Sequence, residues 1–226
     1  SGEALTEQAA TGSWPDWDER SERLLEATEI IRGLWTGKEL HHKGTHYAVD
    51  AKLCNPPRNK IPILMAGNGP KAMRRAGQYA DGLVTDPKTW KQHKSEFEKG
   101  AKAAGKDPKQ MPVLVEQYAV VGDTKDAEAA ARLWRFGPRA FESYYDIRDP
   151  EEIQRRAEAE IPLEKVYADW PVSTDAAPHI KVIDELFESG ATIVNIHSGQ
   201  SDQKRLIEFY GKEVLPRVNR SKAKAA

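Results

Sequence analysis

The feature that most constrains the fold is an alternation of short apolar runs with helix-length stretches. The apolar runs predict strands at residues 61–66, 82–85, 112–121 and 192–197. The run at 61–66 is continuous, which indicates a strand buried on both faces of a parallel sheet. Strands that alternate with helices of about 10–15 residues indicate βαβ units. The chain is therefore predicted to be an α/β protein with about four parallel strands.

Helical spacing and capping residues predict the elements between these strands. Helices are expected from Asp16 or Asp18 to Trp35 and at residues 71–79, 88–104, 125–134, 151–160, 163–168, 175–189 and 201–215. Residues 38–57 alternate irregularly and predict a short hairpin or an extended excursion. Residues 135–150 have no clear period and predict a lid-like loop within an insertion at 135–170. We expect residues 1–218 to form the folded portion and residues 219–226 a flexible tail.

Composition narrows the classes of partner. Lys and Arg total 34 and Asp and Glu total 35, whereas a nucleic-acid-binding protein would carry a basic surplus. No apolar stretch approaches the roughly 20 residues that a membrane-spanning helix needs. The single cysteine, Cys54, permits no internal disulfide, which fits a reducing compartment. These features predict a cytoplasmic protein that acts on a small molecule, with no nucleic-acid or membrane partner.

A glycine-rich corner follows the first predicted strand. Gly67-Asn68-Gly69-Pro70-Lys71-Ala72 fits the pattern G-x-G-x-x-A, and Asp86 lies about 20 residues further on. Glycines let the backbone approach a phosphate closely, and the following helix offers free N–H groups. Three interpretations stay open at this point: a turn without a ligand, a phosphate-bearing cofactor, and an NAD(P) site of Rossmann type that uses Gly67–Asp86.

Histidines are the other candidate chemical groups. His41, His42 and His46 lie close together, but without matching cysteines or acids, so they predict a solvated face and we expect no metal. His197 ends a predicted strand, and ligands bind at the carboxyl ends of parallel strands. His197 is therefore a candidate binding residue.

Three motifs together carry a resemblance to a known family. They are the opening SGEALTEQAATGSWPDWDER, the strand that runs into A-G-N-G-P, and A-D-G-L at residues 80–83. The chain resembles the coenzyme F420-dependent oxidoreductases typified by glucose-6-phosphate dehydrogenase, within the bacterial luciferase-like superfamily. The resemblance implies a (β/α)₈ TIM barrel in which the S-G-E stretch follows the fourth strand. The chain is then expected to be the C-terminal half or so of the barrel, without its N-terminal part.

The resemblance also implies roles for individual residues. Glu3 corresponds to the catalytic glutamate beside the deazaflavin ring, and Thr6 stands where the family has a cofactor-binding asparagine. Gly67, Asn68 and Gly69 form the turn that holds the phosphate-bearing tail of the cofactor. Thr85 and Lys88 correspond to substrate-binding residues.

Two positions depart from the family pattern. Tyr144 stands where the family has a phosphate-binding lysine, and Asp169 stands where it has an arginine. An acid repels a phosphate dianion, and tyrosine offers only a neutral donor. These replacements favour an uncharged or hydrophobic secondary alcohol over glucose 6-phosphate. The family's catalytic histidine is implied to precede Ser1.

The predicted function is hydride transfer between an alcohol or sugar substrate and coenzyme F420, an 8-hydroxy-5-deazaflavin. We expect the isolated chain to have little activity and the full-length protein to be a homodimer. Three alternatives are kept: an NAD(P)-dependent Rossmann oxidoreductase, an FMN-dependent luciferase-like monooxygenase, and a non-catalytic binding protein.

Overall fold

The computed structural model describes residues 2–137 and 141–218 of the chain. It divides into two compact units, one formed by residues 1–61 with 141–157 and the other by residues 62–140 with 158–226. The predicted tail at 219–226 lies outside the described residues. No helix within the described ranges is both long and apolar enough to cross a membrane.

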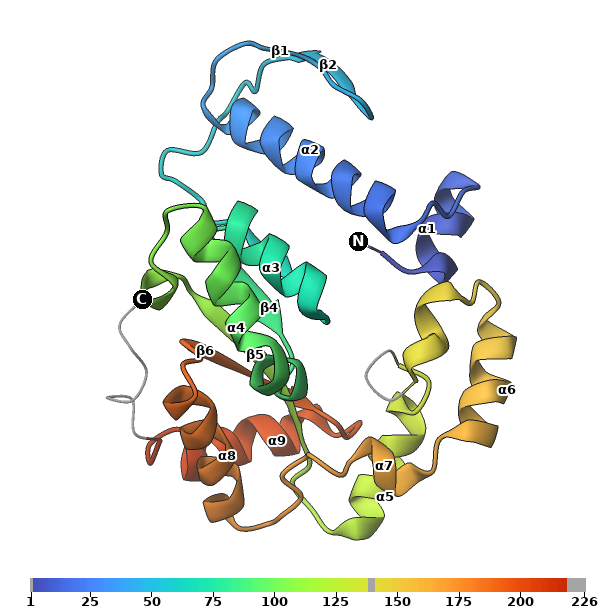
Figure 1. The fold of residues 1–226 in the computed structure, drawn as a ribbon. Coiled ribbons are helices and arrows are strands. Elements are labelled where there is room, and N and C mark those ends of the chain that lie inside the picture. The colour runs from blue at the N-terminus through green and yellow to red at the C-terminus, as the bar shows by residue number, and fades with distance from the viewer. Residues whose placement is uncertain (1, 138–140, 219–226) are drawn as a thin grey trace. The chain divides into compact units, whose positions relative to one another are not determined.

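A four-stranded parallel sheet organises the second unit (Figure 1). Its strands are β3 (Leu64–Ala66), β4 (Gly82–Thr85), β5 (Val113–Ala119) and β6 (Ile193–Ser198). They lie in the order β3-β4-β5-β6, so each strand pairs with the next strand along the chain. This order is that of consecutive strands in a (β/α)₈ barrel, and the described sheet is open. The predicted α/β class and the four parallel strands are confirmed.

Helices connect the strands close to the predicted positions. They are α3 (Pro70–Tyr79), α4 (Pro87–Ala103), α5 (Thr124–Trp134), α7 (Leu163–Val166), α8 (Ala176–Glu188) and α9 (Gln203–Phe209), with a short 3₁₀ turn η1 (Pro108–Gln110) before β5. The single helix predicted for 201–215 is present over residues 203–214, but its second half has π rather than α geometry. There a π-helical turn, η3 (Tyr210–Val214), follows α9, and the N–H of Leu215 donates to the carbonyl of Tyr210. This wider turn accompanies the burial of Tyr210 and Val214 in the core.

The two faces of the sheet differ in burial. Along β5 every second residue from Val113 to Ala119 is buried, and the residues between them, including Glu116 and Tyr118, are half-buried. In β3 only Met65 is buried. The prediction that residues 61–66 are buried on both faces is therefore wrong, because the described residues fully cover only one face.

Glycines allow α3 and α4 to pack backbone to backbone beside the sheet. A Cβ atom on Gly77 would overlap the carbonyl oxygen of Phe97, and one on Gly100 would overlap that of Arg74. Both glycines are helical and lack a positive φ, so it is this close approach, and not an unusual backbone conformation, that requires them.

A cluster of core residues joins α8 to η3 through a buried histidine. His179 is fully buried. Its Nε2 lies 3.0 Å from the carbonyl oxygen of Ser173, which can only accept, so Nε2 carries the proton. Its Nδ1 then accepts from the hydroxyl of Tyr210 at 2.9 Å. Burial lowers the pKa of His179, and the neutral ring is the folded form.

Acid should therefore weaken the folded state through His179. The unfolded histidine binds a proton below about pH 6.5, whereas the folded one resists it, so its contribution is full above that pH and is lost as the pH falls. Chemical denaturation of the wild type and of His179→Gln from pH 7.5 to 5 measures this effect. We expect a shallower loss of unfolding free energy in His179→Gln. Equal slopes would contradict the assignment, since the remaining histidines are common to both proteins.

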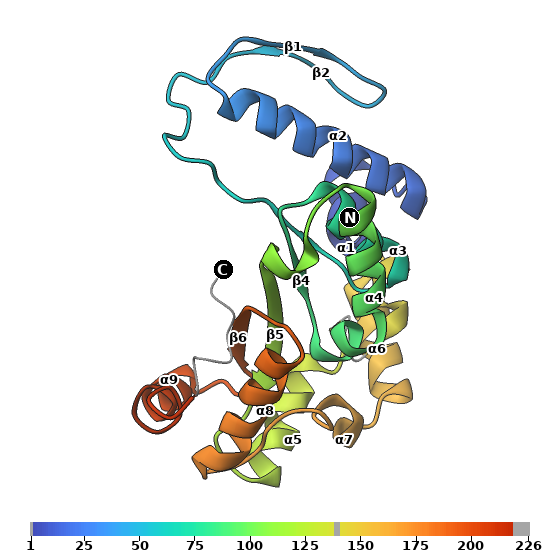
Figure 2. The same ribbon diagram turned by 60° about the vertical axis from the view of Figure 1, so that its left-hand side comes forward.

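The first unit begins with two helices and a hairpin. Helix α1 (Ala4–Thr11) was not predicted, whereas α2 (Trp17–Trp35) begins at Asp16, as expected, with the Asp16 side chain accepting from the N–H of Glu19. Strands β1 (Leu40–Lys43) and β2 (Ala48–Ala51) form an antiparallel hairpin, which confirms the expectation for residues 38–57. Figure 2 shows this hairpin running along α2.

Glu26 of α2 binds the β1–β2 hairpin to this helix. Its carboxylate lies 2.9 Å from Nε2 of His42 and accepts the backbone N–H groups of His46 and Tyr47, each at 2.9 Å. The bond with His42, helped by the two N–H groups, lowers the pKa of Glu26 to about 2. The carboxylate thus stays ionised wherever the protein is folded at ordinary pH.

A second segment completes the first unit. A 3₁₀ helix, η2 (Glu142–Asp146), packs against α1, and α6 (Pro150–Glu160) begins in the same unit. The aperiodic loop predicted for 135–150 is therefore wrong over η2, while residues 138–140 lie outside the described residues. The insertion boundaries 135–170 stay a prediction.

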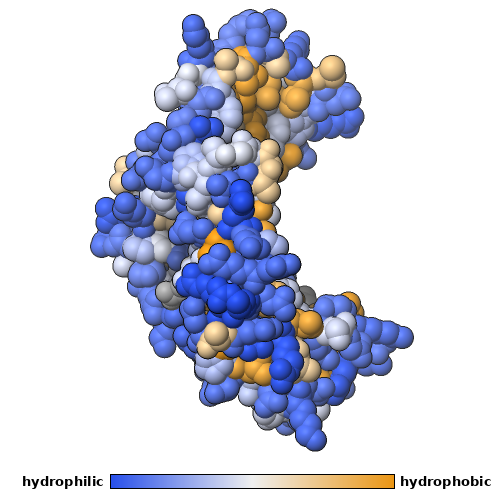
Figure 3. Space-filling view, turned by 90° about the vertical axis from the view of Figure 1, so that its right-hand side faces the viewer, coloured by the Kyte–Doolittle hydropathy of each residue, from blue (hydrophilic) through white to orange (hydrophobic). Residues whose placement is uncertain are grey.

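Apolar side chains interrupt a largely hydrophilic surface (Figure 3). On α2, Leu24 and Ile31 are exposed, and Ser21, Thr28 and Ile30 are the buried residues. The apolar face of α2 is thus only partly covered by the residues that the structure describes.

Candidate functional site

The glycine turn is fixed to the neighbouring strand at the carboxyl edge of the sheet. The N–H of Gly67 donates to the carbonyl of Val84 at 2.9 Å, and the hydroxyl of Thr85 donates to the carbonyl of Gly67 at 2.7 Å. A Cβ atom on Gly67 would lie 3.2 Å from the backbone nitrogen of Met73. Glycine therefore avoids a tight contact with the start of α3 at this position.

The N-terminus of α3 has no side-chain cap. Gly69 is its N-cap residue, in an extended conformation, and Pro70 occupies the first turn. By contrast, α4, α5 and α8 begin at Asp86, Asp123 and Asp175, whose carboxylates accept N–H groups of the first turn. An uncapped first turn after a glycine corner is suited to an anionic group such as a phosphate. The residues present therefore fit the phosphate-bearing tail of a cofactor.

The strand order and Asp86 argue against a Rossmann NAD(P) site. A doubly wound sheet reverses its strand order at the ligand crevice, whereas β3 to β6 follow one another in sequence order. Asp86, the acid expected to bind a ribose, instead accepts the N–H of Thr89 at 2.9 Å and its hydroxyl at 2.6 Å. Asp86 is a helix cap.

The two predicted substrate residues lie in different environments. Thr85 is 2% exposed, and its hydroxyl is bonded to Gly67. Lys88 is exposed in the first turn of α4. Thr85 thus supports the glycine turn, and Lys88 is accessible to solvent.

Glu3 lies at the start of α1 in the first unit. Gly2 before it has a φ of 77°, where a side chain would be strained and would also overlap Glu7. The carbonyl of Glu3 accepts the N–H groups of Thr6 and Glu7 and, at 3.2 Å, the hydroxyl of Thr6. The local backbone therefore fixes where the Glu3 side chain begins.

The Glu3 carboxylate meets a tyrosine from far along the chain. The hydroxyl of Tyr144 donates to Oε2 of Glu3 at 2.8 Å. Burial, together with this bond and the charge of Glu3, raises the pKa of Tyr144 to about 12. The residue aligned with a phosphate-binding lysine thus contacts the predicted catalytic acid.

An aromatic cluster near the carboxyl ends of β5 and β6 was missed by the sequence analysis. Tyr118 stacks between Trp170 and His197, with ring centroids 5.1 and 5.2 Å away, and Trp134 meets it edge-on at 4.8 Å. Nε2 of His197 lies 3.2 Å from Oε1 of Glu116. The candidate residue His197 thus joins this cluster. The alternation of period two within residues 113–119 could have predicted which face of the sheet Tyr118 lies on.

Asp169 precedes Trp170 and is exposed. Its backbone carbonyl accepts the side-chain amide of Gln117 at 3.0 Å. Gln117 is buried, so it ties this loop to the sheet.

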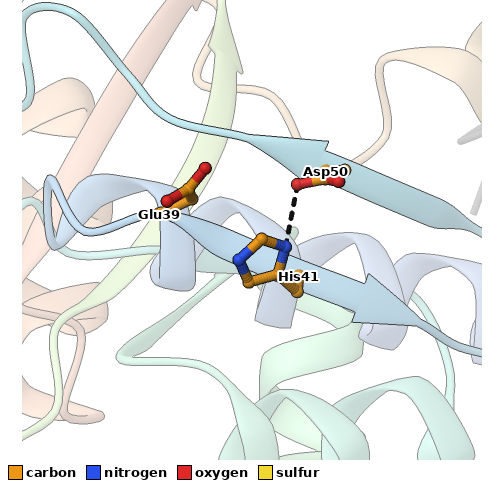
Figure 4. Close-up of side chains that lie close together, drawn as sticks. All are labelled: Glu39, His41 and Asp50. Carbon is orange, nitrogen blue, oxygen red and sulfur yellow. Dashed lines mark ion pairs between the residues drawn. The ribbon is translucent and has the colours of Figure 1, made fainter.

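The hairpin histidines do not form one solvated face. Side chains of His42 and His46 are 21% and 11% exposed and face Glu26 and Glu22 of α2, so the prediction is wrong for both. His41 lies on the other face, paired with Asp50 at 2.8 Å and close to Glu39 (Figure 4). All three residues of that group are exposed, and exposed acidic groups commonly lie together without a metal ion.

Comparison with known proteins identifies the family. The model of the luciferase-like monooxygenase family matches residues 1–201. The chain belongs to the luciferase-like monooxygenase family.

Relatives within the luciferase-like family include F420-dependent dehydrogenases. The F420-dependent hydroxymycolic acid dehydrogenase of Mycobacterium tuberculosis is 40% identical over 96% of this chain and 59% of its own length. The F420-dependent glucose-6-phosphate dehydrogenase of Microbacterium testaceum is 33% identical over 97% of this chain and 67% of its own length. The solved structure of an F420-dependent secondary alcohol dehydrogenase with an F420-acetone adduct has a TM-score of 0.87 and 31% identity, and it covers 96% of this chain and 68% of that one. The chain thus spans about three-fifths to two-thirds of the length of these luciferase-like relatives.

The site residues predicted for this luciferase-like chain divide between the units. Glu3 and Thr6 belong to the first unit, with Tyr144. Gly67, Asn68, Gly69, Thr85 and Lys88 belong to the second. Their roles in binding and catalysis stay predictions.

Replacing Thr85 tests whether its hydroxyl supports the glycine turn. Thr85→Val keeps the shape but leaves the carbonyl of Gly67 without its donor, which should lower the unfolding free energy by about 1–3 kcal/mol. Thr85→Ser restores the hydroxyl and should recover most of that loss. Chemical denaturation of the three proteins measures this, and a Thr85→Val variant as stable as the wild type would contradict the supporting role.

Proposed function

We propose that the protein containing this chain is an F420-dependent oxidoreductase that acts on a CH–OH group. The observation that carries the proposal is the glycine turn of residues 67–69 at the uncapped N-terminus of α3. The family membership and the F420-dependent relatives support the identity of the cofactor. When bound, the deazaflavin supplies the hydride acceptor or donor.

This chain's own residues would bind and orient the reactants. The first-turn N–H groups of α3 would bind the phosphate of the cofactor tail, and Gly67 would keep the backbone close to it. Glu3, held by Tyr144, would lie beside the ring and stabilise one of its protonation states. The residues at the start of α3 would thus position the cofactor, and Glu3 would act on the ring through its charge.

An uncharged secondary alcohol is the proposed substrate class. Tyr144 is neutral and already bonded to Glu3, and Asp169 is an exposed acid. Neither favours a phosphate dianion, which leaves Lys88 as the single cation among the three aligned positions. The hydroxymycolic acid and secondary alcohol dehydrogenases are the relatives whose names agree with this choice. We also propose that the protein containing this chain is a homodimer and is cytoplasmic.

The glycine turn offers a direct test of cofactor binding. A Cβ atom at Gly69 would meet no atom within 4 Å, so we expect Gly69→Asp to fold and to cap α3 as Asp86 caps α4. Its carboxylate would occupy the N–H groups and repel a phosphate, and we expect the Kd for F420 to rise about 10-fold or more, equivalent to about 1.4 kcal/mol. Gly69→Ala is the matched control and should bind within about threefold of the wild type.

Fluorescence titration of each protein with F420 measures these constants. If the wild type binds F420 and Gly69→Asp binds it equally tightly, the proposed phosphate site is overturned. A wild type that binds FMN more tightly than F420 would favour a flavin-dependent monooxygenase. A wild type that binds neither would favour a non-catalytic binding protein.

A further inference from the structure

We propose that Tyr144 is a positioning residue for the Glu3 carboxylate. The proposal rests on the proposed function, in which Glu3 lies beside the cofactor ring. Its basis is the hydrogen bond of 2.8 Å from the Tyr144 hydroxyl to Oε2 of Glu3, within a single unit of the structure.

Several contacts hold the segment of Tyr144 in place against the N-terminal helices. Nε1 of Trp14 donates to Oδ1 of Asp146 at 3.0 Å, and the guanidinium of Arg20 lies 3.7 Å from the centre of the Trp14 ring. At the start of η2, Phe141 is 2% exposed. The hydroxyl of Tyr144 is therefore carried on an anchored turn, so its direction is set before any ligand binds.

The backbone of Glu3 is fixed, but its side chain needs a further constraint. The carbonyl of Glu3 accepts the first hydrogen bonds of α1, while three side-chain torsions separate the carboxylate from that backbone. No other described residue donates a hydrogen bond to the Glu3 side chain in the structure. The Tyr144 hydroxyl is thus the contact that selects one orientation of the carboxylate.

The state of the phenol suits this role. Because burial and the neighbouring carboxylate raise the pKa of Tyr144, the hydroxyl stays protonated and acts as a donor throughout the neutral range. A residue that must hold an acid in place has to keep its proton. Tyr144 also cannot serve as a cation for an anionic substrate, which agrees with an uncharged alcohol.

The hydrogen bond itself can be tested without cofactor. NMR of the chain with ¹³Cζ-labelled tyrosine reports the ionisation of each phenol, and Tyr144→Phe assigns the Tyr144 signal. We expect this signal to stay in the protonated position at pH 10.5 in the wild type and to titrate at lower pH in Glu3→Gln. A Tyr144 signal that is the same in both proteins would overturn the proposal.

Kinetics of the protein that contains this chain test the consequence. Tyr144→Phe removes one oxygen atom, and we expect kcat to fall about 10-fold or more with the Kd for F420 changed less than about threefold. Tyr145→Phe is the matched control, since it removes the same atom from the next residue of η2, whose ring centroid lies 6.1 Å from that of Tyr144, and it should keep the wild-type kcat.

The outcomes separate this proposal from the proposed function. If the wild type does not bind F420, the proposed function fails, whatever the NMR titration gives. If the wild type binds and turns over but Tyr144→Phe keeps its kcat, the positioning role fails alone. Equal losses of kcat in Tyr144→Phe and Tyr145→Phe would also overturn it, because they would indicate a general effect on the turn.

Discussion

The hydrogen bond between Thr85 and the carbonyl of Gly67 determines much of the arrangement at the carboxyl edge of the sheet. It joins the end of β4 to the turn after β3, and with the N–H of Gly67 bonded to Val84 it leaves that turn little freedom. The direction of α3 follows from the turn, and so does the exposure of its first N–H groups. The proposed anion site would therefore need little rearrangement to bind a ligand, which lowers the entropic cost of binding.

A second constraint acts in the other unit, where residues 141 positions apart meet. The segment at 141–157 packs with residues 1–61, although strands β3, β4 and β5 lie between them in sequence. The contact of Tyr144 with Glu3 places a neutral donor where the family resemblance has a cation. At this position Glu3, the proposed catalytic acid, gains a hydrogen-bond partner, and the cation that the resemblance implies for a substrate phosphate is absent.

The sequence predicted the elements of the sheet well and the orientation of side chains poorly. Strand β4 was placed to the residue, and the helix predicted for 175–189 was placed to within one residue at each end, because these signals are local. Helix α1 was missed, since its eight residues lack a strong apolar face. The π-helical turn at Tyr210 depends on tertiary burial, which no local pattern reports. Of the candidate site, the glycine turn could be predicted from its spacing, whereas the bond between Tyr144 and Glu3 could not, because it depends on how distant segments pack.

The central proposal is that the glycine turn of residues 67–69 binds the phosphate of a cofactor at the start of α3. The most direct test is a crystal structure of the protein that contains this chain, with coenzyme F420 bound. We expect the phosphate of the cofactor within hydrogen-bond distance of the first N–H groups of α3. A bound cofactor whose phosphate lies away from α3 would contradict this.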